Sequence, residues 1–325
     1  MKISLVTPAG KQSRGGNRVT AVRWARMLHA LGHLVTVSEA DDGSNADMMI
    51  AVHAWRSADS IRRFADMHPD RPLVVLLAGT DIYRFQDSHP AETHASMERA
   101  DRLVCLHNLV HRAIPEAFRA KLRVIHQSAP SLPGPRQPAS RTFEVCVIGH
   151  LREEKDPMRA ALAARKMPHE SRLRIIHLGR AHDETWVETA RREIAENRRY
   201  IWRGEVPGWK VRRQFARSHA MVISSTMEGG ANVVSEAVAA GLPVIASRID
   251  GNVGLLGEDY TGYYPVQDTD ALAAILWRAE TNPDYLSRLA EQVQSRTGLF
   301  APAREQEAWK SLLTEITSKA PIAGS

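Results

Sequence analysis

Cysteine is scarce in this sequence, since Cys105 and Cys146 are the only two among 325 residues. Each lies in a short apolar stretch, LVCL for the first and VCVIG for the second. Apolar surroundings are typical of buried thiols that play no redox or metal-binding part. We therefore expect two buried free cysteines, without a disulfide framework or a cysteine-based metal site.

Long apolar runs are absent as well. No stretch approaches the ~20 apolar residues that a helix needs to cross a bilayer. The N-terminal residues MKISLVTPAG lead directly into a strand-like pattern and lack the apolar core of a signal peptide. These absences predict a cytoplasmic protein without an integral membrane segment.

No segment of the chain carries a block of charge of one sign. The 43 lysines and arginines exceed the 37 acidic residues by six, and the excess is spread over both halves. A nucleic-acid-binding protein usually concentrates its basic residues in one patch, so no nucleic-acid partner is expected. The composition fits a protein that handles phosphorylated small molecules, and peripheral binding to acidic membranes stays open.

Strand-like apolar stretches alternate with helical patterns along the whole chain, which predicts an α/β fold with doubly wound parallel sheets. In the first half, we expect strands at residues 2–7, 34–38, 48–53, 73–78, 102–106 and 122–126, and a helix at 18–31. In the second half, we expect strands at 143–148, 173–178, 200–202, 221–224 and 244–247 and helices at 209–218, 232–240, 269–279 and 303–317. Residues 249–257, which contain several glycines, are expected to form a loop.

A proline-rich stretch divides the chain. Residues 128–141 read SAPSLPGPRQPASR, with four prolines and few large apolar residues, a composition typical of linkers. We therefore predict a first Rossmann-like domain at residues 1–133, a linker at 134–141 and a second Rossmann-like domain at 142–302, followed by a C-terminal segment at 303–325.

Polar residues gather where the predicted strands of the first domain end. Because the carboxyl ends of parallel strands share one edge of a sheet, where α/β proteins bind ligands, these residues are candidates for one binding crevice. A single histidine in such a place is more often a structural hydrogen-bonding partner than a catalyst, so the clustering carries the prediction. The candidates are His53, Arg56, Thr80, Asp81, His107 and Gln127.

The loop after the first predicted strand reads PAGKQSRGGN. It lacks the G-x-G-x-x-G fingerprint of dinucleotide-binding folds. Gly15, Gly16 and Asn17 open the predicted helix, with Arg18 following them and Lys11 and Arg14 close by. A helix N-terminus beside basic residues suits an anion; the alternative interpretation is a flexible, solvated basic turn.

Residues 221–247 form a strand, turn, helix, turn and strand pattern, with Gly229 and Gly230 in the first turn. Glu228 precedes the glycines and Glu236 lies in the middle of a small, apolar helix. Two carboxylates that flank a helix N-terminus suit a ligand with phosphates in its middle and hydroxyl groups at both ends, such as a nucleotide sugar. The alternative is a plain strand–helix–strand unit with a surface glutamate.

The whole stretch resembles the E-x7-E signature of the two-domain, retaining-type glycosyltransferases. This resemblance implies the GT-B fold, with Glu236 holding the ribose of a UDP-sugar and Glu228 contacting the sugar as a catalytic residue. It implies that the donor also lies against Gly229, Gly230, Ala231, Asn232 and Val233. The matching positions are Glu228, Gly229, Asn232, Glu236, Ala237, Ala239, Gly241, Pro243 and Val244.

The turn GHLREEKDP after the strand at 143–148 resembles the diphosphate-binding turn of the same family. The resemblance assigns Gly149 to the donor site and Lys155 to catalysis as a diphosphate cation. The family's arginine after the glycine is missing, because His150 stands there and Arg152 is the nearest arginine. A charged surface helix start is the alternative. Arg203, in RGEVP, matches an element near the nucleotide base.

The first domain resembles more narrowly the selenosugar synthases, through VTPAGKQSRGGN, VHAWRSA, LAGTDIY and IHQSA. These enzymes of selenoneine biosynthesis join selenophosphate to the sugar of UDP-N-acetylglucosamine or UDP-glucose. The strand-end residues and residues 15–18 would then bind the acceptor, and the C-terminal helix would cross back onto the first domain. No metal-binding spacing is visible, so no metal or other cofactor is expected. Two alternatives remain: a hexosyltransferase for a hydroxyl acceptor, and a non-catalytic nucleotide-sugar-binding protein.

Overall fold

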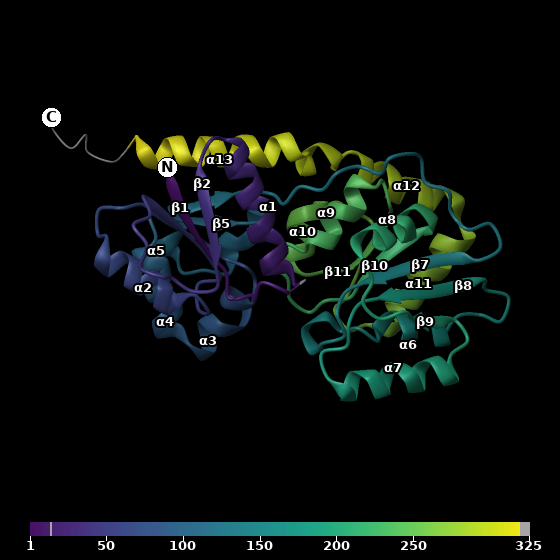
Figure 1. The fold of residues 1–325 in the computed structure, drawn as a ribbon. Coiled ribbons are helices and arrows are strands. Elements are labelled where there is room, and N and C mark those ends of the chain that lie inside the picture. Colours follow the sequence, from purple (N-terminus) through teal and green to yellow (C-terminus); the bar gives the residue numbers. More distant parts are fainter. Residues whose placement is uncertain (14, 319–325) are drawn as a thin grey trace. The chain divides into compact units, whose positions relative to one another are not determined.

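The computed structural model describes residues 1–13 and 15–318, and its chain divides into two compact units (Figure 1). Unit 1 comprises Met1–Gln127, the four residues Glu228–Ala231 and the described chain from Pro302 onward. Unit 2 comprises Ser128–Met227 and Asn232–Ala301. Each unit contains one parallel sheet with helices on both faces.

The sheet of unit 1 has six parallel strands in the order β2-β1-β3-β4-β5-β6. The register places Leu5 of β1 between Val37 of β2 and Ile50 of β3. All five residues of β3 are buried, as expected for a central parallel strand that is covered on both faces. The strands are β1 (Lys2–Val6), β2 (Leu34–Ser38), β3 (Met48–Val52), β4 (Leu73–Leu76), β5 (Arg102–Cys105) and β6 (Leu122–Val124).

Two apolar clusters cover the two faces of this sheet. One contains Ile50 with Trp24 and Trp309, and the other contains Met49 with Phe64 and Met97. Neighbouring residues of β3 therefore serve opposite faces, as the alternation of side chains along a strand requires. The helical elements are α1 (Gly16–Ala30), α2 (Ala58–Met67), α3 (Gln86–Ser88), α4 (Pro90–Arg99), α5 (Glu116–Arg119) and α13 (Pro302–Thr317), with a π-helix at Asp81–Phe85 and a 3₁₀ turn at Asn108–Arg112.

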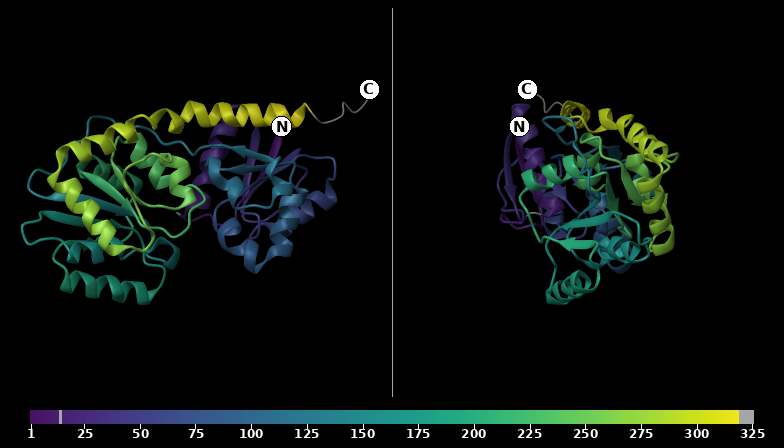
Figure 2. Two further views of the ribbon diagram at one scale, coloured as in Figure 1. Left: turned by 180° about the vertical axis from the view of Figure 1, so that it is seen from behind. Right: turned by 90° about the vertical axis from the view of Figure 1, so that its right-hand side faces the viewer.

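The C-terminal helix α13 lies alongside α1 (Figures 1 and 2). Trp24 and Trp309 meet edge to face, with ring centroids 4.7 Å apart. The buried carboxylate of Glu305 accepts a hydrogen bond from Trp24 Nε1 at 2.7 Å and pairs with Arg23. Near the other end of α13, Arg123 and Arg102 hold Glu315 and lower its pKa to about 2. Paired charges at both ends thus fix α13 in unit 1.

The sheet of unit 2 also has six parallel strands, in the order β12-β11-β10-β7-β8-β9. The chain runs outward from β7 in one direction and then returns to β10 on its other side, so the strand order reverses between β7 and β10. Such a switch point is where open α/β sheets bind ligands. The strands are β7 (Phe143–Ile148), β8 (Leu173–Leu178), β9 (Tyr200–Trp202), β10 (Ala220–Ile223), β11 (Val244–Ser247) and β12 (Tyr263–Tyr264).

The helices of unit 2 include four for which the sequence pattern gave no residue range, at 159–165, 184–196, 250–256 and 283–294. The expected loop at 249–257 is wrong, because Asp250–Leu256 is the helix α10, whose residues from Gly251 onward are buried. Asn252 anchors it by donating to the carbonyl of Ser247 at 2.9 Å, and Gly257 ends it at φ +98°. The helices are α6 (Arg159–Arg165), α7 (Glu184–Glu196), α8 (Gly208–Arg217), α9 (Asn232–Ala239), α10, α11 (Thr269–Thr281) and the unpredicted α12 (Pro283–Gln294), with 3₁₀ turns at Glu153–Lys155 and Thr297–Phe300.

The proline-rich segment has no regular secondary structure but is held against α8 within unit 2. The N–H groups of Gln137 and Ala139 donate to the carbonyls of Ala216 and Arg217, at 2.8 and 3.0 Å. The half-buried Arg136 donates to the carbonyl of Ser218 at 2.9 Å. These hydrogen bonds hold the segment in one position along α8.

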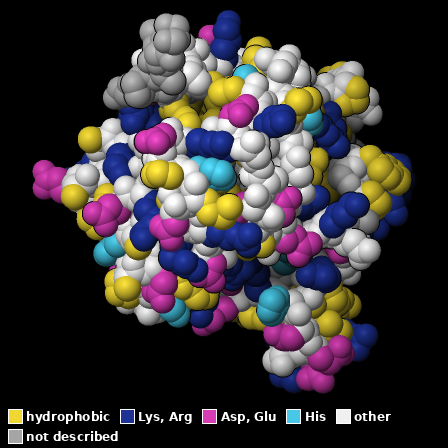
Figure 3. All heavy atoms as spheres, turned by 60° about the vertical axis from the view of Figure 1, so that its left-hand side comes forward, with side chains coloured by type: hydrophobic (Ala, Val, Ile, Leu, Met, Phe, Trp, Pro, Cys, Tyr) yellow, Lys and Arg dark blue, Asp and Glu magenta, His cyan; other side chains and the backbone are white. Residues whose placement is uncertain are grey.

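The described surface mixes both signs of charge. Figure 3 shows basic and acidic side chains interspersed over the face that it presents. Among the described helices, none combines the length and the apolar character that crossing a membrane requires. Cys105 and Cys146 are both buried free thiols, as predicted.

Candidate functional site

The turn that begins at Gly149, at the carboxyl end of β7, is fixed by a buried histidine. His177 of β8 donates from Nε2 to the carbonyl of Gly149 at 3.0 Å, and its Nδ1 accepts from the Tyr200 hydroxyl at 2.9 Å. Burial lowers the pKa of His177 to about 4, so the ring is neutral near pH 7 and keeps this tautomer. Gly179 is required beside it, because a Cβ there would lie 1.8 Å from the Gly149 carbonyl oxygen.

His150 presents one N–H to the carboxyl edge of this sheet. Its Nδ1 accepts a hydrogen bond from the backbone N–H of Arg180 at 3.1 Å. In the neutral ring the proton therefore lies on Nε2. Burial lowers the pKa of His150, and the neighbouring Arg152 lowers it further. His150 is thus a neutral donor at the position where the resembling family has a permanent cation.

Within unit 2, the turn after Gly149 is hydrogen-bonded to the segment that follows β10. Thr226 donates its N–H to the carbonyl of Glu154 at 2.9 Å. Ser224 Oγ donates to the carbonyls of Lys155 and Asp156, at 3.0 and 2.8 Å. The turn that carries Lys155 therefore has a fixed place next to the segment that leads to Glu228. Arg152 forms an ion pair with Glu154 at 3.1 Å, so its charge is already matched within the turn.

The residues of the E-x7-E stretch lie between β10 and the middle of α9. Glu228 and Ala231 are buried, and Gly230 adopts φ +120°, a conformation that residues with a Cβ rarely take. Asn232 begins α9, and Val233 and Glu236 are half-buried in it. Gly229 is buried in the turn itself. The signature thus opens a helix at the carboxyl edge of the sheet.

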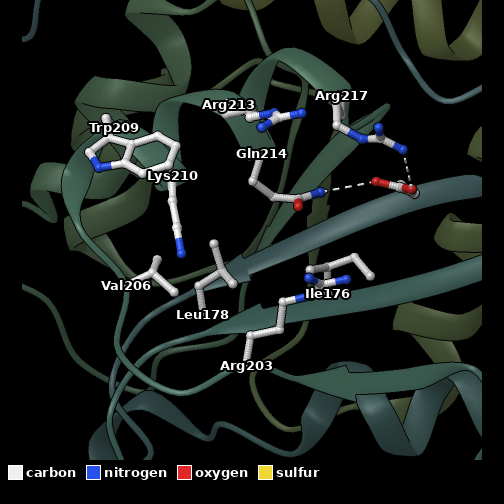
Figure 4. Close-up of a pocket in the computed structure, with 10 residues that line it drawn as sticks. Ile176, Leu178, Arg203, Val206, Trp209, Lys210, Arg213, Gln214 and Arg217 are labelled. Atoms are coloured by element: carbon white, nitrogen blue, oxygen red, sulfur yellow. Dashed lines mark hydrogen bonds and ion pairs between the residues drawn. The ribbon is translucent and has the colours of Figure 1, made fainter.

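Arg203 was predicted to lie near the nucleotide base. It lines a hollow between α8 and the strands β8 and β9 that we call the α8 hollow (Figure 4). Ile176 and Leu178 form the floor of the α8 hollow, and Lys210, Arg213 and Arg217 of α8 line its other side. None of the other predicted donor residues lines it.

In unit 1, the N-terminus of α1 is open to an anion. Gly15 is the N-cap and provides no side-chain hydrogen bond, and the first turn of α1 contains no acidic residue. Gly16, Asn17 and Arg18 make up that turn, with the side chains of Asn17 and Arg18 half-buried. Lys11 is exposed. Arg14, also predicted near this anion site, lies outside the described residues.

Two buried side-chain oxygens of unit 1 have no hydrogen-bond partner in the described chain. Gln127 donates from Nε2 to Thr20 Oγ1 in α1 at 2.7 Å, while its own Oε1 has no partner among the described residues. Thr7 Oγ1, at the end of β1, is likewise buried without a partner in the described chain. Unsatisfied buried polar atoms are costly and often mark a place where a ligand or water binds. Thr7 was missed by sequence reasoning; its position directly after the first strand was the available signal.

Asp81, predicted to contact the acceptor, has a structural role in the described chain. Its buried carboxylate accepts hydrogen bonds from the backbone N–H groups of Ala54, Ala78, Gly79 and Ile82, at 2.7 to 3.2 Å. It thereby joins the turns that follow β3 and β4. His53, at φ +81°, hydrogen-bonds through Nε2 to Thr80 Oγ1 at 2.9 Å across these turns. Burial lowers the pKa of His53, with Arg56 adding to the effect.

An aromatic cluster supports the exposed Arg56 in the same part of unit 1. Trp55 stacks on Phe85 with centroids 3.9 Å apart, and the guanidinium of Arg56 lies 5.6 Å from the Phe85 centroid. Arg84, carried by the π-helix, lies 5.8 Å from the same centroid. The π-helix is a form often found at functional sites. Sequence reasoning missed Phe85 and Arg84, because neither belongs to a recognisable motif.

Among the described residues, no group of three histidine, cysteine or acidic side chains is placed to hold a metal ion. The groups available for a diphosphate in unit 2 are Lys155, the His150 N–H and the backbone N–H groups at the start of α9. Such donors suit a leaving group whose negative charge grows during bond cleavage.

Comparison with known proteins identifies the family of this chain and its fold. Residues 134–296, half of the chain, match the family described as "Glycosyl transferases group 1". The solved structure of HepE from Anabaena, in complex with UDP and glucose, is 16% identical with a TM-score of 0.75 and covers 97% of this chain and 100% of its own. The sucrose-phosphate synthase from Thermosynechococcus elongatus is 15% identical with a TM-score of 0.82, and covers 98% of this chain and 99% of its own.

These structural likenesses support the predicted GT-B fold, with two Rossmann-like units. The family match covers the glycine turn after β7, the α8 segment and the whole E-x7-E stretch. The chain therefore belongs to the glycosyl transferases group 1 family.

Proposed function

We propose that this protein is a selenosugar synthase, which transfers the sugar of UDP-N-acetylglucosamine or UDP-glucose to selenophosphate in selenoneine biosynthesis. The donor part of the proposal rests on the family match and on the linked turns that carry Lys155 and lead to Glu228. It is supported by HepE, which was solved in complex with UDP-glucose.

The acceptor part rests on the open N-terminus of α1. A helix of 15 residues with no side-chain cap and no acid in its first turn favours an anion there. The buried Thr7 hydroxyl can donate or accept a hydrogen bond with a small polar ligand, and the Gln127 Oε1 can accept one. Arg18 supplies a cation in the same turn. A small tetrahedral anion matches these groups better than an extended apolar acceptor.

In the proposed reaction, the selenium atom of selenophosphate forms a bond to the anomeric carbon while the bond from that carbon to the UDP oxygen breaks. Lys155, the His150 N–H and the start of α9 stabilise the charge that develops on UDP. Water then cleaves the phosphorus–selenium bond, which releases phosphate and leaves the 1-seleno-sugar. Because selenium is already nucleophilic, this step needs no strong general base, and the neutral His53 suits such a site.

Mass spectrometry of the complete reaction tests the proposal. Purified protein with UDP-N-acetylglucosamine or UDP-glucose and selenophosphate should form the 1-seleno-sugar together with UDP and phosphate. Arg18→Ala should raise the apparent Michaelis constant for selenophosphate and leave UDP binding unchanged. Efficient transfer to an ordinary hydroxyl acceptor, with only hydrolysis in the presence of selenophosphate, would instead favour a hexosyltransferase. UDP binding without any turnover would favour a nucleotide-sugar-binding protein.

A further inference from the structure

The α8 hollow is the part of unit 2 that the proposed reaction leaves unused. It has a volume of about 410 Å³, within the range of small-molecule sites. Its floor, Ile176 and Leu178, is aliphatic, and Trp209 at one end is 60% exposed. A large aromatic side chain exposed beside an aliphatic floor offers apolar surface to a ligand.

Cations surround this apolar floor on two sides. Lys210, Arg213 and Arg217 share one face of α8, since they are spaced by three and four residues. In Figure 4, Leu178 lies between these side chains and Arg203, which comes from the end of β9. The hollow therefore has positive groups on both sides of an apolar base.

The charges at the two ends of the hollow differ in how they are matched. At one end Glu144 pairs with Arg217 at 3.2 Å and accepts from Gln214 at 3.1 Å. At the other end no described acidic side chain pairs with Arg203, Lys210 or Arg213. Lys210 instead lies 5.4 Å from the ring centroid of Trp209. Three cations without a described acidic partner therefore lie beside an exposed indole.

We propose that the α8 hollow is a second ligand site, which binds an amphiphilic organic phosphate. The phosphate lies among Arg203, Lys210 and Arg213, where guanidinium groups can form paired hydrogen bonds with its oxygens. The apolar part of the ligand covers Leu178 and Ile176 and contacts Trp209. A soluble phosphate ester and a phospholipid headgroup both have this chemistry. We place this site apart from the donor site, because Arg203 is the one predicted donor residue among those that line it.

Calorimetry with phenyl phosphate tests the assignment. Inorganic phosphate, which has no apolar group, is the comparison. Phenyl phosphate should bind, and inorganic phosphate should bind about tenfold or more weakly, since it leaves the apolar floor uncovered. The double variant Lys210→Glu/Arg213→Glu should lose at least about tenfold in affinity for phenyl phosphate. The matched control is Arg192→Glu/Arg198→Glu, which reverses two exposed charges outside the hollow and should bind as the wild type does.

UDP competition and vesicle binding complete the test. Phenyl phosphate should remain bound in saturating UDP, and the Lys210/Arg213 variant should bind UDP as the wild type does. Displacement by UDP, or equal affinity for phenyl phosphate and inorganic phosphate, would overturn the proposal. Vesicles of phosphatidylcholine with added phosphatidylglycerol distinguish the sources: binding that the charge reversal abolishes assigns the site to a lipid headgroup. If neither phenyl phosphate nor these vesicles bind, the hollow is not a phosphate site. None of these outcomes depends on selenosugar formation.

Discussion

The imidazole of His177 and the carbonyl of Gly149 are joined by a 3.0 Å hydrogen bond from Nε2, and the imidazole is buried in unit 2. His177 lies near the end of β8 and is buried, and it fixes the turn that carries His150. The Tyr200 hydroxyl completes the arrangement from β9. His177 thereby positions His150, which we expect to bind the ligand.

Replacing His177 should loosen the Gly149 turn. His177→Ala removes a partner from the half-buried Gly149 carbonyl and from the buried Tyr200 hydroxyl, and a buried group left unsatisfied costs about 1–3 kcal/mol. We expect a loss of unfolding free energy of about 2 kcal/mol or more, and an affinity for UDP that is lower by about tenfold. Tyr200→Phe removes only one hydroxyl and should cost about 1 kcal/mol. Wild-type UDP affinity in a folded His177→Ala protein, measured by calorimetry, would show that the turn does not depend on this histidine.

Stability should decrease on acidification because of the same histidine. In the unfolded chain a histidine titrates near pH 6.5, whereas the pKa of buried His177 is about 4. The unfolded state therefore binds the proton more readily between these values. The contribution of neutral His177 to the free energy of unfolding is fully present above pH 6.5 and is lost as the pH is lowered toward 4. The shift corresponds to about 3 kcal/mol at most. Denaturant unfolding at several pH values should show a shallower decrease for His177→Gln; an unchanged slope would contradict the neutral assignment.

Glu236→Ala should weaken binding of UDP. The proposed role of Glu236 is to accept hydrogen bonds from the ribose, and bonds to a charged group contribute about 1.5–3 kcal/mol. The affinity should therefore fall by about tenfold or more. Glu188→Ala on α7 is the matched control, since Glu188 is exposed and outside the predicted site. Equal UDP affinity of the two variants by calorimetry would remove Glu236 from the donor site.

Lys155→Ala should lower turnover more than it lowers substrate binding. The negative charge on the diphosphate grows in the transition state, and loss of a preorganised stabilising group typically costs about 10²–10³ in rate. Steady-state kinetics of UDP release should show this as a fall in kcat with a smaller change in KM. We also predict that turnover does not need added Mg²⁺. A reversible loss of activity in EDTA would contradict that prediction.

Asp81→Asn tests the structural role of the carboxylate that joins the turns after β3 and β4. An amide nitrogen cannot accept, so some of the four backbone N–H groups lose their partner. We expect the free energy of unfolding to fall by about 2–3 kcal/mol. In a folded sample, calorimetry should show unchanged UDP binding while the Michaelis constant for the acceptor rises. A variant as stable as the wild type would assign Asp81 to ligand binding instead.

Much of the fold follows from the sequence alone. Parallel strands covered on both faces must be apolar throughout, so β3 and β7 are visible as short runs of large apolar residues. The E-x7-E stretch is equally visible, because Gly229 and Gly230 mark the start of its helix and Gly241 and Pro243 mark the end. The helix α10 was not predicted, since its glycines at 251 and 254 are typical of loops. Only the packing of Val253, Leu255 and Leu256 in unit 2 makes the segment helical.

The roles of individual polar residues were decided by the tertiary structure. The sequence placed His53, Thr80 and Asp81 at strand ends but could not distinguish a ligand contact from a hydrogen bond within the protein. That distinction depends on which backbone N–H groups the folded turns direct at Asp81. His177 lies within an apolar strand, where only its partners on two other segments, Gly149 and Tyr200, give it a role. The sequence determines which elements form, because patterning is local, whereas the partners of buried polar atoms are set by segments distant in the chain.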